Sequence, residues 1–361
     1  MKRRQFLYGA AGGAAASTLA APAIAQDRYE WTMVMPWPAN APGVGVNAVR
    51  LANYITEMTD GRLTVTPYGA GELVPPFECF DAVQSGSADC FHGTPYYWVS
   101  KSQAFHLFAG VPFGFSAVDL TGWLYFGGGQ ELWDEAYGAF GIKPFYVGSS
   151  GTQAGGWFRQ EVNSLDDLRG LRMRYAGLGG EVMRRLGAAV VLTPPGEIFA
   201  AMQSGNVDAA EWVAPWNDMA FGLHQVADYY YLPAFHEPGP SLELSINVDR
   251  WNELPDDLKA IVRHACGSSG TESLADFHYH NIEALGPLVE EHGVQIRRFP
   301  DEVIAEIGRV SMELMQELAE TDAEFGHVWE SYHAHLLKAA RYDQLMEGAM
   351  IEQRASVLLG G

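Results

Sequence analysis

The sequence is poor in cysteine. Its 361 residues include three, Cys79, Cys90 and Cys266, and none forms a CxxC or CxxCH pair. The chain therefore offers no dithiol redox motif and no c-type haem attachment site. An odd count leaves at least one thiol free, and a disulfide between Cys79 and Cys90 is an open alternative. Cys90 falls in a predicted buried strand, where a free thiol behaves as a small hydrophobic side chain.

Positive charge is also scarce, with 23 Lys and Arg against 44 Asp and Glu. Residues 1–25 carry three of the positive charges and no acid, so the rest of the chain has 20 against 44 and a net charge of −24. This argues against nucleic acid and anionic membrane surfaces as partners, because both need a basic patch. A small anionic ligand is still allowed, since one Arg inside a pocket outweighs a screened distant charge.

Motifs of common enzymes are missing. The sequence has no HExxH, GxSxG or GxxxxGK, and GLGGEVM at 177–183 does not have the GxGxxG spacing. Two HxH pairs, His278 with His280 and His333 with His335, would point to different faces of a helix, so solvated histidines are expected. The sequence therefore predicts a protein that is not an enzyme.

Beyond the N-terminus there is no long uncharged apolar run. The chain begins MKRRQFLYG, with Arg3 and Arg4 adjacent, and a short apolar stretch leads to Ala23-Ile24-Ala25, which fits the small-x-small cleavage rule. Residues 1–25 thus resemble a twin-arginine signal peptide, which predicts a periplasmic protein. The 336 residues that follow are enough for two domains.

One pattern occurs twice. FDAVQSGSADC at 80–90 and FAAMQSGNVDAA at 199–210 both follow a Pro-Pro pair, and a Pro with aromatic neighbours follows each. Both predict a helix, a glycine cap and a strand, within a βαβα order typical of α/β domains with largely parallel sheets. Chance recurrence of a short motif is the alternative. Two lobes of one design would place both aromatic loops at strand ends, where α/β sheets bind ligands.

The predicted architecture is a two-lobed α/β fold with a hinge. Lobe 1 is assigned to 26–148 plus about 240–285, and lobe 2 to 149–239. Residues 286–361 are assigned to C-terminal helices, because apolar residues recur without proline from Asp301 onward. These are either several helices that wrap across both lobes or one long helix exchanged with a second subunit, with glycines at 308 and 326 as candidate breaks.

Polar residues at predicted strand ends are the candidate ligand-binding groups. Arg174 ends a strand and is suited to clamp a carboxylate, although either Arg172 or Arg174 could simply extend along the surface. Glu211, followed by Trp212, lies just beyond a strand, and Glu237 lies in a loop bounded by Pro and Gly. Solvated acids are the simpler interpretation. Two acids facing an anionic ligand would require a cation, and their hard oxygens favour Na⁺ or Ca²⁺ over Zn²⁺.

Longer stretches resemble the extracytoplasmic solute receptors of TRAP transporters. The resemblance is carried by GAGELVPPFECFDAVQSGSADCFHGTPYYW, GSSGTQAGGWF, LRGLRMRYAGLGGEVMRRLGAAVVLTPPGEIFAAMQSGNVDAAEWVAPWND and WNELPDDLKAIV. The chain is most similar to the branch that binds 2-oxo monocarboxylates, and to a related calcium-lactate receptor. The resemblance implies lobes that close on the ligand, a homodimer formed through a long C-terminal helix, and delivery of the ligand to membrane subunits.

The resemblance also implies a residue set. Gln153 and Arg174 hold the carboxylate, while Glu211, the Trp212 carbonyl and Glu237 hold a cation, with Na⁺ expected first and Ca²⁺ as the alternative. The aromatic loops supply possible pocket walls, namely Tyr96, Tyr97, Trp98, Trp212, Trp216 and Asn217. The chain has APWND where relatives are expected to have GPYDD. This difference lies at the end of the predicted pocket and could admit a different ligand tail, so a sugar acid, a polyol or an aromatic acid is the alternative cargo. A periplasmic oxidoreductase is the rival class.

Overall fold

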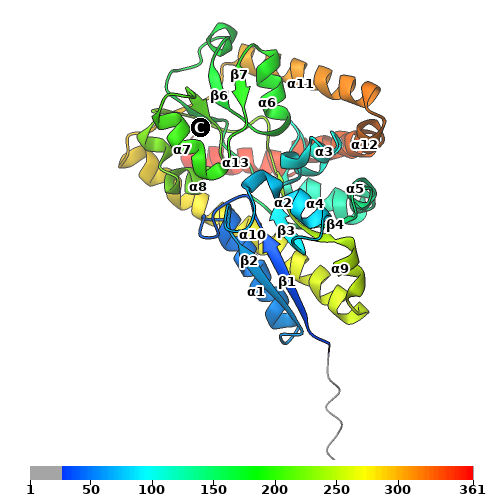
Figure 1. Cartoon of the computed structure of the whole chain (residues 1–361). Helices are drawn as coiled ribbons and strands as arrows, with labels where there is room; N and C mark the ends of the chain where they lie inside the picture. The colour runs from blue at the N-terminus through cyan, green and yellow to red at the C-terminus, as the bar shows by residue number, and fades with distance from the viewer. Residues whose placement is uncertain (1–26, 361) are drawn as a thin grey trace, which may run out of the picture.

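The computed structural model describes residues 27–360, and the predicted signal peptide at 1–25 lies outside the described residues. Two β-sheets organise the chain into two lobes (Figure 1). The first sheet has the strand order β2-β1-β3-β10-β4, in which β1, β2 and β3 are parallel and β10 is antiparallel to both its neighbours. Its strands are β1 (Tyr29–Val34), β2 (Leu63–Tyr68), β3 (Cys90–Gly93), β4 (Ile142–Ser149) and β10 (Ser241–Asn247).

The second sheet has the order β11-β9-β5-β8-β6-β7. Strands β6, β7 and β8 are parallel, and β5 runs antiparallel between β8 and β9. The strand bounds are β5 (Gly156–Phe158), β6 (Arg172–Arg174), β7 (Ala189–Val191), β8 (Ala209–Ala210), β9 (Tyr229–Tyr231) and β11 (Gln295–Arg297). Because β11 pairs with β9, the segment 286–361 is not purely helical: it also gives this sheet an edge strand.

The two copies of the sequence pattern have the same local structure. Each begins with a short 3-10 turn (Pro76–Glu78 and Pro195–Glu197), continues as a helix, α2 (Cys79–Gln84) or α7 (Ile198–Gln203), and ends at a glycine with positive φ. In both copies an aspartate then starts the strand by donating its backbone N–H to the neighbouring strand: Asp89 to Thr32 O and Asp208 to Arg172 O. Pro-led turns follow, Pro95–Trp98 in one copy and α8 (Pro215–Ala220) in the other. The repeated sequence therefore marks equivalent positions in the two sheets.

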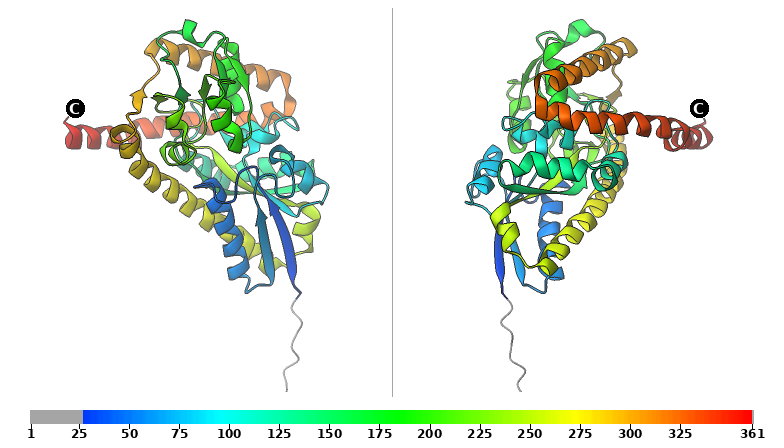
Figure 2. Two further views of the ribbon diagram at one scale, coloured as in Figure 1. Left: turned by 60° about the vertical axis from the view of Figure 1, so that its left-hand side comes forward. Right: turned by 90° about the vertical axis from the view of Figure 1, so that its right-hand side faces the viewer.

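Helix α10 (Asp256–Glu290) connects the lobes (Figure 2). At the first sheet, Ser269 Oγ donates to Val147 O at 3.0 Å. At the second lobe, the backbone N–H of Trp216 donates to Asn281 Oδ1 at 3.0 Å. One long helix thus forms part of the core of both lobes.

The remaining helices surround the sheets. They are α1 (Val44–Met58), α3 (Phe105–Ala109), α4 (Ala117–Phe126), α5 (Gly129–Gly138), α6 (Gly177–Arg185) and α9 (Val248–Glu253), with 3-10 turns at Leu165–Leu168 and Leu223–Gln225. Within residues 27–360, no helix combines the length and the apolar character that crossing a bilayer requires. All three cysteines are buried and free, so the Cys79–Cys90 disulfide is not formed.

The C-terminal segment forms three helices, α11 (Asp301–Thr321), α12 (Ala323–Leu345) and α13 (Glu347–Leu359). Helix α11 contacts α6, while α12 contacts α3, α4 and α5. The first break falls at Asp322, whose Oδ1 caps α12 by accepting from Phe325 N at 3.0 Å. The glycine break points were wrong, because both glycines lie inside helices and the aspartate supplies the cap. Helix α13 extends away from the rest of the chain and buries none of its residues (Figure 2).

Candidate functional site

Arg174 is fully buried at the end of β6. Its Nη1 donates to Glu211 Oε2 at 2.7 Å and to the Glu211 carbonyl at 2.5 Å. Its Nη2 has no hydrogen-bond partner among residues 27–360. Arg172, two residues earlier, is half-exposed and pairs with Asp208. Arg174 is therefore the buried arginine of this strand, and its Nη2 is available to donate to a ligand.

Glu211 directly follows β8, the strand next to β6, and hydrogen bonds fix both its backbone and its side chain. Its backbone N–H donates to Arg174 O at 3.1 Å, and its Oε2 also accepts from Ala176 N at 3.3 Å. Burial alone would raise the pKa of this carboxyl, but Arg174 and the hydrogen bonds outweigh burial and lower it. Glu211 is thus a buried carboxylate whose second oxygen, Oε1, has no partner in the described chain.

Glu237 lies in the loop between β9 and β10, only 2% exposed. Neither of its carboxylate oxygens has a hydrogen-bond partner within 27–360. Burial, with a contribution from the nearby Glu211, raises the pKa of Glu237 well above its usual value. A second buried carboxyl without a partner is costly unless a proton or a cation compensates it.

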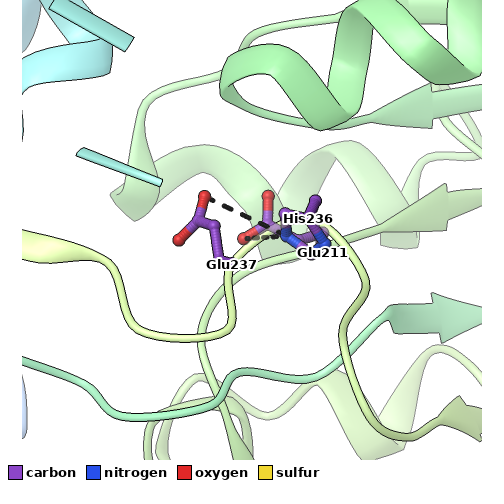
Figure 3. Close-up of side chains that lie close together, drawn as sticks. All are labelled: Glu211, His236 and Glu237. Atoms are coloured by element: carbon purple, nitrogen blue, oxygen red, sulfur yellow. Dashed lines mark ion pairs between the residues drawn. The ribbon is translucent and has the colours of Figure 1, made fainter. Parts of the chain in front are cut away.

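His236 completes a cluster with these two acids (Figure 3). Its Nε2 is 3.9 Å from Glu211 Oε1 and 4.0 Å from Glu237 Oε1. The three side chains point toward one another, and each offers one possible ligand atom within 4.8 Å of the others. Sequence reasoning missed His236, although its place beside Glu237 in a loop bounded by Pro and Gly was a usable signal.

Gln153 lies in the segment that leads from β4 to β5 and is tied to the Glu237 loop by its backbone. Its N–H donates to Glu237 O at 3.2 Å, and its carbonyl accepts from Ala234 N at 2.9 Å. Its Nε2 donates to Ser150 Oγ at 3.0 Å, while its Oε1 is unpartnered in the structure as described. The structure thus brings Gln153 to the same loop as Glu237.

A small cavity of about 20 Å³ lies next to Gln153 and Trp212, and its lining does not include Arg174, Glu211, His236 or Glu237. Gln153, Tyr96, Tyr97 and Trp212 are among its lining residues, together with Trp37, Val44, Thr94, Ser150, Val213, Pro240, Ser241 and Leu242. Its walls come from both lobes and are mainly apolar or aromatic, as in most small-molecule sites. The Trp212 ring also faces the Arg174 guanidinium, with 5.7 Å from Cζ to the ring centroid.

Three predicted wall residues do not line this cavity. Trp98 is buried and donates from Nε1 to Glu243 Oε1 at 2.9 Å. Trp216 stacks on His280 of α10 at 4.3 Å between ring centroids. Asn217 donates from Nδ2 to Pro42 O at 2.7 Å and so connects α8 to the start of α1. These side chains support the elements around the cavity.

The arrangement fits a bound cation and a small anion. The buried unpartnered atoms comprise acceptors, namely Glu211 Oε1, both Glu237 oxygens and His236 Nε2, and one charged donor, Arg174 Nη2. Hard oxygen ligands suit Na⁺ or Ca²⁺, and a free guanidinium nitrogen suits a carboxylate.

Comparison with known proteins gives a consistent result. Residues 33–322 match the family described as bacterial extracellular solute-binding protein, family 7. A curated relative from Nostoc sp. (strain PCC 7120), a monocarboxylate 2-oxoacid-binding periplasmic protein, is 38% identical over 342 residues, covering 92% of this chain and 93% of the relative.

Solved structures of TRAP solute-binding proteins share the fold. One from Colwellia psychrerythraea, with bound calcium and pyruvate, is 34% identical with a TM-score of 0.88 over 91% of this chain and 100% of that one. One from Pseudoalteromonas atlantica, with sodium and pyruvate, is 34% identical with a TM-score of 0.88, covering 90% and 99%. One from Bordetella bronchiseptica, a mixed-occupancy dimer with calcium and picolinate in one site, is 31% identical with a TM-score of 0.90, covering 92% and 99%.

Proposed function

Because this chain belongs to the bacterial extracellular solute-binding proteins of family 7, we propose that it binds a small 2-oxo or 2-hydroxy monocarboxylate together with a metal cation. The chain is a TRAP-transporter solute receptor of the periplasm, which confirms the resemblance, the two-lobed fold and the location predicted from sequence. The relatives that hold calcium or sodium beside pyruvate support the cation.

The observation that carries the proposal is the set of unpartnered charged atoms in one buried site. Arg174 Nη2 is free to donate to a carboxylate, while Glu211 Oε1 and both oxygens of Glu237 have no hydrogen-bond partner in the described chain. An anion alone would be repelled by the two acids. A cation bound by Glu211, Glu237 and the Trp212 carbonyl removes that repulsion and supplies a positive centre for the ligand's oxygens.

Gln153 is the second proposed ligand-binding group. Within residues 27–360 its Nε2 bonds only to Ser150 Oγ, an exchangeable partner at the cavity wall. Transfer of this donor to the ligand would give the carboxylate a hydrogen bond from each of two segments. The aromatic walls of the cavity favour an apolar tail on the ligand.

The function is tested by isothermal titration of the mature protein after dialysis against chelator. Pyruvate, 2-oxobutyrate, lactate, picolinate and mannitol are added in Ca²⁺, in Na⁺, and in K⁺ with chelator. Saturable binding of a 2-oxo acid that disappears with chelator is the expected result. Binding that ignores the cation, or binding of mannitol alone, contradicts the proposal. A visible spectrum of the same sample tests the expectation that the chain is not an enzyme, since a flavin or haem band would favour an oxidoreductase.

Two partners belong to the proposed function. One is another copy of this chain, with which it would form a homodimer. The dimer is supported by the exposed apolar residues of α13, including Ile351 and Leu358, and by the dimeric Bordetella relative. An isolated helix of this length has little stability in water without packing. The second is the set of membrane subunits to which a TRAP receptor delivers its ligand.

The lobe boundaries are part of the proposal as well. We assign 26–148 plus about 240–285 to lobe 1, 149–239 to lobe 2 and 286–361 to a C-terminal segment of helices that also gives the second sheet its strand β11. The assignment is supported by two loops that cross between the sheets, at 150–155 and 232–240, in addition to the crossing made by α10. These two crossings carry Gln153 and Glu237, so closure of the lobes would move two binding groups directly.

A further inference from the structure

His236 is buried, 1% exposed, and its ring is fixed by one hydrogen bond. Its Nδ1 is 2.9 Å from the hydroxyl oxygen of Tyr175, and that hydroxyl donates to the carbonyl of Gly155 at 3.0 Å. Tyr175 also packs its ring against the imidazole, with 4.5 Å between ring centroids. The orientation of the ring is therefore determined by its neighbours on the side away from the two acids.

This hydrogen bond determines which nitrogen carries the proton. A tyrosine hydroxyl has a single proton, and here Gly155 O accepts it. With that proton directed at Gly155 O, the Tyr175 oxygen can accept from His236, which favours the tautomer protonated at Nδ1. In the neutral ring, Nε2 consequently presents its lone pair to Glu211 and Glu237.

Three potential ligand atoms, one from each side chain, therefore converge on one point. The separations of 3.9 and 4.0 Å from Nε2 to the two Oε1 atoms are too long for hydrogen bonds. They suit ligands of one shared ion, because each ligand atom of a bound cation lies roughly 2.0–2.6 Å from it. Nε2 itself has no hydrogen-bond partner in the described chain.

We propose that Nε2 of His236 is a ligand of the bound cation. The site then combines nitrogen and oxygen ligands and takes a divalent transition ion such as Mn²⁺ or Co²⁺ as well as Ca²⁺. Imidazole is a good ligand for such ions, whereas Na⁺ and Ca²⁺ prefer oxygen. The inference rests on the proposed function, since it concerns the same site.

The summed charge of the site also favours a divalent ion over Na⁺. When both acids are ionised as cation ligands, Arg174 and the carboxylates of Glu211 and Glu237 carry one negative charge in sum, and a bound monocarboxylate makes it two. A divalent ion neutralises this buried charge completely, and Na⁺ leaves one negative charge, which is costly to bury.

The test is pulsed EPR of the Mn²⁺-loaded wild-type protein with pyruvate, prepared with natural histidine and with ¹⁵N-labelled histidine. A nitrogen coupling that changes isotope with the label is the expected result. Absence of any histidine nitrogen coupling overturns the proposal. Because this measurement uses the wild type, it does not depend on whether a variant folds.

A competition experiment adds a second readout. In His236→Gln, an amide replaces the imidazole, and the ratio of Co²⁺ to Ca²⁺ affinity should fall at least about tenfold, because even outer partners of metal ligands change metal affinity by that much. The matched control is His327→Gln, which changes a half-exposed residue of α12 and should leave the ratio unchanged. An equal ratio in wild type and His236→Gln contradicts the proposal. If wild-type titration shows no cation-dependent binding of any monocarboxylate, the proposed function fails instead, so the two failures are distinguishable.

Discussion

Arg174 and Glu211 form an ion pair that water does not reach: Nη1 and Oε2 are 2.7 Å apart and the side chains are 1% and 0% exposed. The pair joins the ends of neighbouring strands, β6 and β8. Since Glu211 uses only one carboxylate oxygen and Arg174 only one terminal nitrogen, each keeps an atom available. The ion pair therefore sets a carboxylate-binding nitrogen beside a cation-binding oxygen.

Changing Arg174 should remove ligand binding. Arg174→Lys keeps the charge but loses the planar fork, and Arg174→Met also leaves Glu211 without its buried partner. Loss of a buried charged partner costs about 2–5 kcal/mol of binding, so the Kd for pyruvate should rise at least about 30-fold in the Met variant. Calorimetry in saturating Ca²⁺ measures it, and thermal unfolding should show that the Met variant is also less stable.

The matched control for this experiment is Arg172→Met. It removes a half-exposed arginine from the same strand, and pyruvate affinity should stay within about twofold, since exposed ion pairs contribute little. Similar affinity losses in the Arg172 and Arg174 variants would contradict the assigned role.

Glu237→Gln should uncouple stability from the cation. In wild type, Ca²⁺ should raise the melting temperature, because a ligand that binds only the folded state stabilises it. The variant should melt at or above the wild-type temperature in chelator, since burial already disfavours the charged form of Glu237, and should gain much less from Ca²⁺. Scanning fluorimetry with and without Ca²⁺ measures both, and Glu253→Gln, at a half-exposed site, is the control. A full Ca²⁺ response in Glu237→Gln would exclude this residue as a cation ligand.

Asp218 should make stability depend on pH. It accepts from Trp157 Nε1 at 2.9 Å, Tyr230 OH at 2.7 Å and Val213 N at 3.0 Å, and burial raises its pKa from 3.8 to about 7. The folded state therefore holds a proton that the unfolded state releases near pH 4. This contribution to stability is fully present below that pH and is lost as pH rises through about 7, by up to about 1.4 kcal/mol per pH unit.

The measurement is urea unfolding at pH 5 and pH 8 in chelator. The wild-type free energy of unfolding should fall by about 2 kcal/mol more than that of Asp218→Asn over this interval. Asp166→Asn changes an exposed carboxyl and should keep the wild-type slope. The same pH slope in wild type and Asp218→Asn would show that the carboxyl is not protonated in the folded protein near neutrality.

Deletion of residues 346–361 should convert the protein to a monomer with little change in ligand affinity. None of the residues of α13 is buried within the chain, so its removal should leave each lobe intact. Sedimentation velocity at micromolar concentration measures the mass, and calorimetry measures pyruvate binding. The paired substitutions Ile351→Asp and Leu358→Asp provide a milder variant, with Glu352→Lys and Arg354→Glu as a charge-neutral control. A monomeric wild type, or a dimeric deletion variant, would refute the role of α13.

Local sequence chemistry determined the repeated unit and its strand ends. Pro-Pro before a helix, glycine with positive φ after it and an aspartate at the strand start are short-range signals, and they predict that Glu211 follows a strand. The family resemblance added Gln153 and assigned the Trp212 carbonyl and Glu237 to the cation. The assignment of the C-terminal run to helices also followed from its apolar period, which depends only on nearby residues.

Long-range packing decided the rest. The sequence does not show that β10 inserts between β3 and β4, that β11 completes the other sheet, or that Asp322 rather than a glycine separates α11 from α12. His236 becomes a candidate ligand only because Tyr175, which directly follows β6, orients its ring. Asp218 becomes a proton-binding group only because the fold buries its carboxyl. Protonation, ligand geometry and burial depend on neighbours distant in sequence, so only the tertiary structure decides them.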